Sequence, residues 1–364
     1  MGEKRRTCSR REFLVRTTAG AAAIATARRG MSSSAEGGHR VVLEGVDRYR
    51  VIDPWAEGAR VALTYRGEPY SAEHVQGISG VAFRIAGICP CAPTSSSAMD
   101  PRELIERFGY ETEGVPLGGE DIDPDAAVEA MAGRVSDEVR AGRPALVWHA
   151  FTTAEWDVVC GFDEEKGEFV GRGSYAGAEE YACADAGRAA TCGDVCPPLG
   201  AVLIGEKTGE LDAPAAELTA LREAVDHAGS LRSDPMGAEG WVFLEGLAAY
   251  DRWVEDFQNP EKTRTSGDAY CYGVYRSTHR AAAAFLADIA PRHAAAEASL
   301  ARASESFAQE ADALDGGEHL LWWGSPEGPD AERNAQAGAL LAKARAAYED
   351  GINHIEAGLD ALGV

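Results

Sequence analysis

Residues 142–173, GRPALVWHAFTTAEWDVVCGFDEEKGEFVGRG, decide the fold because two apolar runs and a turn follow one another in the order of a β-meander. Residues 147–151 predict one strand and residues 156–162 the next, since both runs are rich in β-branched and aromatic side chains. Residues 163–167, DEEKG, carry the polar, glycine-ending pattern of a hairpin turn into a third strand at residues 168–170. The middle of the chain therefore predicts an antiparallel sheet.

The flanking segments predict helices before this sheet and one more strand after it. Residues 40–63 begin with RVVLEGVDRYRV, which indicates a first strand and a turn that leads into a helix. Residues 101–110 and 123–141 predict two further helices, and the second of them starts with an Asp-Pro cap pattern. Residues 199–205, LGAVLIG, are an apolar run bounded by glycines and predict a strand that closes the same sheet.

The composition changes near residues 206–214, and from there to the last residue the sequence predicts helices and no strand. One of these segments carries a continuous apolar stripe at three-to-four spacing, which is typical of a helix that packs into a core. The residues of the stripe are Trp241, Leu244, Leu247, Tyr250, Trp253, Val254 and Phe257. The helices are expected at residues 215–227, 236–256, 269–289, 292–314 and 331–362.

The pattern of residues 142–148 and 155–163 resembles the central sheet of papain-like domains. In those domains a strand after Gly-x-Pro precedes a strand that opens with Gly-His and ends with Gly, an aromatic residue and Asp. The most similar kin are the butirosin-biosynthesis-protein-H-type and bacteriocin-processing-type cysteine peptidase-like proteins, which carry a helical tail that residues 246–257 and 268–286 also resemble.

This resemblance implies an α+β fold with two domains. A papain-like domain with a central antiparallel sheet is expected at residues 40–210, and an all-helical domain at residues 211–364. A parallel, doubly wound sheet, or strands beyond Leu211, would contradict this expectation.

The same resemblance places a nucleophile at the start of an apolar helix, where this chain has Ser79 followed by the apolar residues 81–83 and 85. A helix amino terminus lowers the pKa of a thiol and offers N–H groups to an oxyanion. Trp156 stands where the family has the activating histidine, so Ser79 has no base in that register. Ser79 is either a nucleophile or a helix cap whose hydroxyl bonds an unpaired backbone N–H.

Other residues complete the list of candidates for catalysis or binding. His149 is either a base that points into the cleft or a packed core residue, and Asp157 either accepts a bond from His149 or substrate or is solvated. Cys91 is a candidate nucleophile in the turn-rich loop CPCAPTSSS. Tyr272 and His279 either contact a ligand between the two domains or pack the helices together.

We expect any ligand to bind in a cleft bounded by Ser79, the loop at residues 89–97, His149, Trp156 and the helical domain. A papain-like site lies where the nucleophile helix meets the sheet, and that surface survives the loss of catalysis. Trp156 would then offer a stacking face and one N–H donor in place of a base. If Trp156 is buried core and the helical domain fills the cleft, no ligand is expected there.

Seven cysteines follow the first 27 residues, and an odd number leaves at least one thiol unpaired or available for a metal or for chemistry. Structural disulfides or inert thiols, a zinc or iron–sulfur site and a nucleophilic cysteine are the three alternatives. The spacing is not C-x2-C…C-x2-C, so we expect no metal and no cofactor. The seven are Cys89, Cys91, Cys160, Cys183, Cys192, Cys196 and Cys271.

Residues 9–14, SRREFL, match the twin-arginine export consensus, and a weakly apolar run at residues 17–25 follows them. Residues 25–27, Ala-Thr-Ala, offer a small-x-small cleavage site, so residues 1–27 are expected to be a signal peptide. The alternative is a cytoplasmic protein with a basic, disordered arm. A membrane anchor is disfavoured, because the apolar run is much shorter than the roughly 20 residues that a span requires. We expect an exported protein that folds before it leaves the cytoplasm.

The net charge of the chain, −24, excludes several classes of partner. Residues 1–27 hold six basic and two acidic residues, so their removal would change the net charge from −24 to −28. Such a charge disfavours nucleic acid and anionic lipid, and leaves a small molecule or a peptide as the expected partner.

Two functions follow from these residues. The first is an exported ligand-binding or scaffold protein with a papain-like domain that lacks the family Cys-His pair. The alternative is an amide hydrolase or acyltransferase that has rebuilt its site from Ser79, Cys91, His149 or Asp157. The absence of both motif residues favours the first, because a serine without a positioned base is a poor nucleophile near neutral pH.

Overall fold

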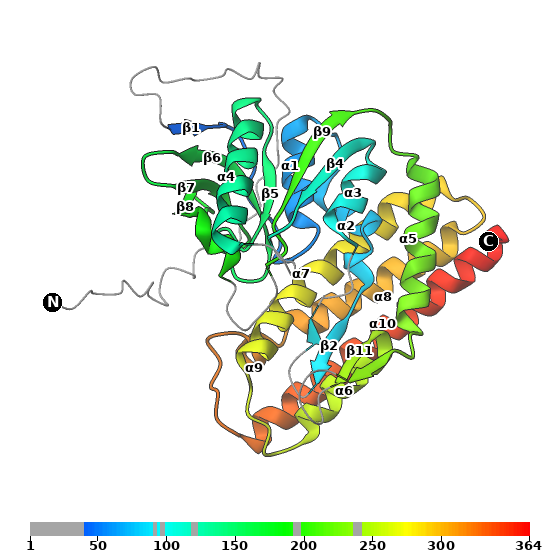
Figure 1. The fold of residues 1–364 in the computed structure, drawn as a ribbon. Coiled ribbons are helices and arrows are strands. Elements are labelled where there is room, and N and C mark those ends of the chain that lie inside the picture. Colours follow the sequence, from blue (N-terminus) through cyan, green and yellow to red (C-terminus); the bar gives the residue numbers. More distant parts are fainter. Residues whose placement is uncertain (1–39, 90–92, 95–98, 118–122, 192–197, 236–241) are drawn as a thin grey trace.

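The structure is a computed structural model, and it describes residues 40–89, 93–94, 99–117, 123–191, 198–235 and 242–364 (Figure 1). It contains an antiparallel sheet, a second and smaller sheet, and helices that pack on both. The chain is therefore a mixed α+β protein, as the sequence predicts. Within the described ranges, no helix combines the length and the apolarity that a membrane crossing requires.

The larger sheet has the strand order β4-β9-β5-β6-β7-β8, and β1 pairs with the far end of β6. Every pairing in it is antiparallel, and β5, β6 and β7 form the expected meander. The strands are β1 (Arg40–Val42), β4 (Tyr110–Val115), β5 (Ala145–Trp148), β6 (Trp156–Asp163), β7 (Glu168–Arg172), β8 (Ala182–Asp185) and β9 (Ala201–Lys207).

The sequence located the middle of this sheet and missed two of its outer strands. β6 and β7 begin where they were expected, whereas β5 ends at Trp148 because His149 has a left-handed backbone with φ 62°. β9 lies inside the sheet between β4 and β5. β4 reads YETEGV and β8 reads ACAD, and neither carries the apolar run that marked the central strands.

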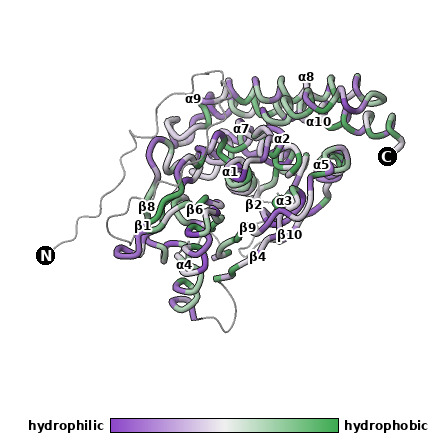
Figure 2. The backbone as a smooth tube through the Cα atoms, turned by 90° about the horizontal axis from the view of Figure 1, so that it is seen from above, coloured by the Kyte–Doolittle hydropathy of each residue, from purple (hydrophilic) through white to green (hydrophobic). Residues whose placement is uncertain are grey.

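Two helices cover the sheet from opposite sides. α1 (Glu57–Arg66) and α4 (Pro124–Arg140) both contact β6, and Figure 2 shows one on each side of it. A Cβ atom at Gly58 would lie 2.7 Å from the carbonyl oxygen of Trp156, so only glycine lets α1 approach β6 this closely. α4 buries Met131, Val135 and Val139, a stripe at four-residue spacing, as its sequence predicts.

The apolar helix expected to begin at Ser79 does not form. α2 (Ala72–Ile78) ends there instead, with Ser79 as its C-cap and Gly80 in the left-handed region at φ 75°. A single 3-10 turn, η1 (Val81–Phe83), follows before the chain enters β2. Glycine at a left-handed position ends a helix, and the apolar residues after it are buried as a turn and a strand.

Three long helices, α7, α8 and α10, run side by side and carry the second half of the core (Figure 1). α8 buries Leu300, Phe307 and Leu314, and α10 buries Leu341, Tyr348 and Ile355, in each helix at seven-residue spacing. These three helices are α7 (Ser266–Ile289), α8 (Glu297–Asp315) and α10 (Ala331–Leu362). The remaining helical segments are α3 (Pro101–Arg107), η2 (Ala186–Ala190), α5 (Ala213–Ala228), α6 (Gly246–Gln258), η3 (Ala290–Arg292) and α9 (Glu318–Leu321).

The expectation that no strand follows Leu211 is wrong, so residues 211–364 are not all-helical. β10 (Ser233–Pro235) and β11 (Val242–Glu245) form a four-stranded antiparallel sheet with β2 (Ala86–Cys89) and β3 (Pro93–Thr94). The helix expected at residues 236–256 starts only at Gly246, whose φ of 57° separates it from β11.

The segments before and after residue 210 share one core. β2 pairs with β11, and α2 packs against α7. The hydroxyl of Tyr348 donates to the carbonyl of Phe83 over 2.8 Å, and that of Tyr275 donates to the carbonyl of Ala86 over 2.8 Å. Both carbonyls belong to the turn and strand after Ser79, so the helices after residue 210 pack directly on this segment.

Candidate functional site

Ser79 is a buried cap rather than an exposed nucleophile. Its hydroxyl donates to the carbonyl of Gln76 over 2.8 Å and accepts a bond from the N–H of Val81 over 3.2 Å. Its exposed fraction is 1%. The bond from the N–H of Val81 agrees with the interpretation of Ser79 as a cap, although it caps the 3-10 turn that follows and not an α-helix. Because no α-helix begins at Ser79, a helix amino terminus neither activates its hydroxyl nor binds an oxyanion there.

His149 closes the turn between β5 and β6. It is buried, and its Nδ1 accepts a bond from the N–H of Ala154 over 3.1 Å, which places the ring hydrogen on Nε2 in the neutral form. Burial and the charge of Arg188 lower the pKa of His149, while a bond to the backbone of Thr191 opposes them. The imidazole is therefore neutral at pH 7 and one of its nitrogens is engaged within the turn.

Asp157 organises the same turn from a fully buried position. It accepts bonds from the N–H groups of Phe151 at 2.6 Å and Thr152 at 2.9 Å, and from the hydroxyl of Thr152 at 2.6 Å. Burial raises the pKa of Asp157 to about 7, against the lowering effect of these bonds. The idea of an ordinary solvated residue is wrong, because the carboxyl group is enclosed by the turn that it holds.

Trp156 lies in the core beside the amino end of α1. Its exposed fraction is 5%, its ring packs edge-on against Trp148 at 5.4 Å, and its Nε1 has no hydrogen-bond partner within the described residues. Its backbone N–H donates to the carbonyl of Pro54 over 3.0 Å. A ligand-stacking role for Trp156 stays a prediction.

The helix whose amino end meets Trp156 is α1, and not a helix that begins at Ser79 as the sequence predicts. Asp53 holds the turn before this helix by accepting bonds from the N–H groups of Trp55, Ala56 and Glu57, the last of which is the first residue of α1. Asp53-Pro54 repeats the residue pair that caps α4, but here the helix begins three residues after the proline.

A cluster of buried carboxyl groups lies around the end of β5 and the start of α1. Glu155 accepts a bond from the hydroxyl of Tyr270 on α7 over 2.7 Å and a second from Ser174. Burial raises the pKa of Asp53 and of Glu155 to about 7, and the charge of Asp157 adds to the effect on Glu155. Among the described residues, no group of three or more His, Cys, Asp or Glu side chains is arranged to hold a metal ion.

Tyr272 and His279 are fully buried between helices. The hydroxyl of Tyr272 donates to the carbonyl of Leu314 on α8 over 2.5 Å. His279 pairs with Glu310 on α8, Nδ1 to Oε1 over 2.7 Å, and its ring stacks on that of Tyr348 at 5.7 Å. These contacts support the interpretation that both residues pack the bundle.

The described cysteines support the inert-thiol interpretation in one case. Cys160 is an unbridged thiol inside β6, and burial raises its pKa to about 12, which removes it as a nucleophile. Cys183 is an exposed thiol on β8. Cys91, together with most of its loop, lies outside the described residues, as do Cys192 and Cys196.

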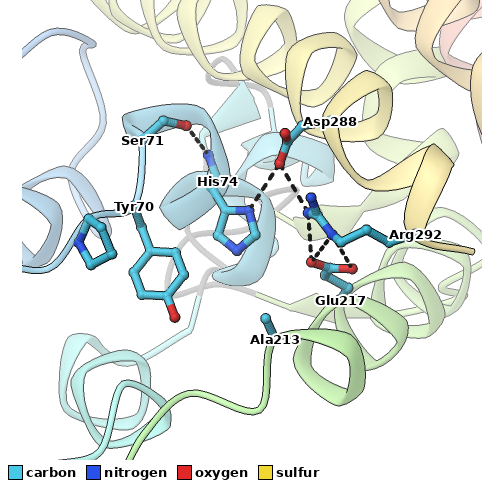
Figure 3. Close-up of a pocket in the computed structure, with 8 residues that line it drawn as sticks. Tyr70, Ser71, His74, Ala213, Glu217, Asp288 and Arg292 are labelled. Atoms are coloured by element: carbon cyan, nitrogen blue, oxygen red, sulfur yellow. Dashed lines mark hydrogen bonds and ion pairs between the residues drawn. The ribbon is translucent and has the colours of Figure 1, made fainter.

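A pocket of about 450 Å³ lies between the start of α2, the start of α5 and the end of α7 (Figure 3). Three distant segments build it, so no local sequence pattern could have marked it. Its lining residues are Pro69, Tyr70, Ser71, His74, Ala213, Glu217, Asp288 and Arg292.

His74 is held in the wall of this pocket by contacts on several sides. Its ring stacks on Tyr70 at 5.2 Å and meets the edge of Phe285 at 5.6 Å. Its Nδ1 lies 3.6 Å from Oδ2 of Asp288, and its buried Nε2 has no hydrogen-bond partner within the described ranges. Ser71 fixes the start of α2 by accepting a bond from the N–H of His74 over 3.1 Å.

An ion-pair network forms the opposite wall. Arg292 donates to Oε1 of the fully buried Glu217 from Nε at 3.1 Å and Nη2 at 2.8 Å, and Nη2 also donates to Oδ2 of Asp288 at 3.0 Å. His293 contacts the other oxygen of Glu217 at 2.8 Å. The bond from Arg292 lowers the pKa of Asp288, so its carboxyl group is ionised at pH 7.

None of the three comparisons, with family models, with curated proteins and with solved structures, finds a match for this chain.

Proposed function

We propose that this protein is an exported ligand-binding or scaffold protein without catalytic activity, whose central antiparallel sheet resembles that of papain-like domains and which lacks the Cys-His pair of that family. The observation that carries the proposal is that Ser79, His149 and Asp157 are each engaged in local structural hydrogen bonds. Export rests on the twin-arginine pattern of residues 9–14.

The chemistry of these bonds disfavours nucleophilic catalysis at Ser79. A serine attacks only when a base removes its hydrogen, and that hydrogen already points to the carbonyl of Gln76. The seryl group is also 1% exposed, so a substrate carbonyl would have to displace packed side chains to reach it. A geometry of this kind supports a role in packing rather than in acyl transfer.

One observation favours the alternative, a hydrolase or acyltransferase. Glu155 and Asp157 both have a pKa of about 7, which is the range that suits a general acid or base. Both side chains are fully buried, however, and their oxygens are bonded to groups of the protein itself. Burial explains the raised pKa values without any catalytic role.

The test is a search for turnover and for binding in the same preparation of the exported chain. We expect small molecules that raise the melting temperature and no hydrolysis or acyl transfer with amide, ester or thioester substrates. Turnover that is lost in Asp157→Asn or His149→Ala, and retained in the control Asp350→Asn on the exposed face of α10, would overturn the proposal.

A further inference from the structure

We propose that the pocket between α2, α5 and α7 binds a small molecule through an ammonium group that donates to Nε2 of His74 and is attracted by the negative charge of the lining, to which Asp288 contributes. The inference rests on the proposed function, because it names the site and the class of ligand. It moves the expected ligand away from the cleft at Trp156.

The first step concerns the hydrogen on the imidazole of His74. A carboxylate beside one ring nitrogen favours the tautomer with the hydrogen on that nitrogen, here Nδ1 beside Asp288 at 3.6 Å. Nε2 then carries a lone pair and can only accept a bond. Figure 3 shows this nitrogen directed away from Asp288, toward the space between Tyr70 and Ala213.

The unused acceptor distinguishes His74 from an ordinary packed histidine. Its exposed fraction is 7%, and Nε2 is buried without a hydrogen-bond partner in the part of the chain that the structure describes. Buried polar atoms in folded proteins are nearly always bonded. A donor from a ligand in the pocket would complete the set of bonds.

The second step concerns the charge of the pocket. Arg292 is neutralised by two carboxylates, Glu217 and Asp288, and Glu217 is also in contact with His293. With His74 neutral, the lining carries two carboxylates and one guanidinium group, within a chain of net charge −24. An ammonium group is favoured by this field, whereas a carboxylate or phosphate is disfavoured.

The rest of the pocket limits the ligand to a small one. The hydroxyl hydrogen of Ser71 is not used by the cap bond and can donate to a hydroxyl or ether oxygen of the ligand. Pro69 and Ala213 add apolar surface. A volume of about 450 Å³ suits a compact amine with a second polar group.

Binding should also depend on pH. The charged groups that face His74 are Glu217 from α5, Asp288 from α7 and Arg292 from η3. Burial lowers the pKa of His74, so the imidazole is neutral at pH 7 and accepts. Below that pKa the ring gains a hydrogen on Nε2, repels an ammonium group and releases the ligand.

The probes are ethanolamine, ethylene glycol and glycolate, three molecules of similar size with positive, zero and negative charge. Imidazole ¹H–¹⁵N NMR of the full chain reads the Nε2 resonance of His74 during each titration. We expect saturable shifts with ethanolamine, much weaker ones with ethylene glycol, and none with glycolate. Equal or tighter binding of ethylene glycol or glycolate, or no binding of ethanolamine, would overturn the inference.

Variants test the same contacts. Asp288→Asn should weaken ethanolamine binding about tenfold or more, whereas Asp350→Asn, which removes the same charge from α10, should leave it within about twofold. His74→Phe keeps an aromatic ring beside Tyr70 and should abolish binding. If His74→Phe fails to fold, the Asp288→Asn titration decides alone.

The two proposals can fail separately. Ethanolamine that binds with unchanged affinity to Asp288→Asn would overturn the pocket assignment and leave a ligand-binding function in place. Turnover that depends on His149 or Asp157 would overturn the proposed function, and the titration at His74 would still report on the pocket.

Discussion

Two histidine–carboxylate pairs in this protein have the same chemistry and different surroundings. His279 and Glu310 meet across α7 and α8 at 2.7 Å, with both side chains fully buried. His74 and Asp288 lie 3.6 Å apart in the wall of a pocket, and the side chain of Asp288 is 60% exposed. The first pair belongs to the core, whereas the second leaves Nε2 of its imidazole for a ligand.

The pKa values of the two histidines move in opposite directions. Burial opposes the charged form of His279, but the attraction and the hydrogen bond of Glu310 outweigh it and raise its pKa. Burial lowers the pKa of His74 and the charge of Arg292 adds to this effect, while the charges of Glu217 and of the more distant, solvated Asp288 oppose it only in part. A buried carboxylate in direct hydrogen-bond contact therefore raises the pKa of His279, whereas burial outweighs the nearby carboxylates at His74.

Removal of Glu310 should have the largest effect on stability. Glu310→Ala leaves His279 and the hydroxyl of Tyr250 without their buried acceptor, so a loss of about 3–5 kcal/mol in the free energy of unfolding is expected. Urea unfolding at about pH 6 measures it. The stabilisation by this pair is fully present below pH 6.5, the ordinary pKa of histidine, and is lost as pH rises through the raised pKa of folded His279.

The control for this variant is Asp312→Ala on the same helix. Asp312 pairs with Arg280 at the surface, and its removal should cost less than about 1 kcal/mol. A double variant, His279→Leu with Glu310→Leu, should recover part of the loss. Apolar side chains then replace both partners, whereas Glu310→Ala alone leaves a buried imidazole without its partner. Equal losses in Glu310→Ala and Asp312→Ala would show that the pair is not a core contact.

Glu155 shows the effect of burying a carboxyl group without an imidazole partner. Its pKa rises from the ordinary 4.5 to about 7, so the folded protein holds a proton that the unfolded chain releases. Stability should therefore fall as pH rises from about 4.5 to about 7. Glu155→Gln keeps the shape and the bonding capacity toward Ser174 and Tyr270, and should flatten this fall when urea midpoints are compared at several pH values.

Asp53 and Asp157 also have pKa values of about 7, so the Glu155→Gln protein should still lose some stability as pH rises. Glu164→Gln, at the exposed hairpin between β6 and β7, is the matched control and should leave the slope unchanged. A Glu155→Gln protein with the full slope would mean that Glu155 is ionised in the folded state throughout.

The sequence predicted the elements whose signals are local. α10 spans the expected residues 331–362, because one periodic pattern runs from the N-cap Asp330 to Gly363 in a left-handed conformation. β6 and β7 followed from apolar runs around a polar turn. The small sheet could not be predicted in this way, since β11 is four residues long and its partner β2 lies far away in the sequence.

The candidate site was harder to predict than the fold. His149 and Asp157 were chosen because polar residues stand out among apolar strands, but such residues also brace a turn, as both do here. His74 stands between a glutamate and a valine in a segment without a recognisable motif, and only the folding of α5 and α7 around it brings Asp288 and Arg292 nearby. A pocket built from three segments leaves no pattern in any one of them.

Removal of the Tyr348 hydroxyl, which lies in the core beside His279 and Glu310, should lower the free energy of unfolding moderately. Tyr348→Phe keeps the ring stacked on His279 and removes only the bond to the carbonyl of Phe83 at 2.8 Å. A loss of about 1 kcal/mol is expected in urea unfolding, since a buried carbonyl loses one partner. Tyr270→Phe is a useful parallel, because its hydroxyl instead bonds Glu155. No loss in Tyr348→Phe would mean that the carbonyl finds another donor.

Asp288→Asn should have the smallest effect on stability and the clearest effect on its histidine. The carboxylate is 60% exposed and Arg292 keeps its bonds to Glu217, so the free energy of unfolding should change by less than about 0.5 kcal/mol. The charge of Asp288 raises the pKa of His74, so the variant should have a still lower pKa there, measured by NMR titration of the imidazole beside the control Asp350→Asn. A loss of stability comparable to that of Glu310→Ala would make His74 and Asp288 a second core pair. An unchanged pKa would mean that Asp288 does not govern the imidazole, and the acceptor role assigned to Nε2 would lose its physical basis.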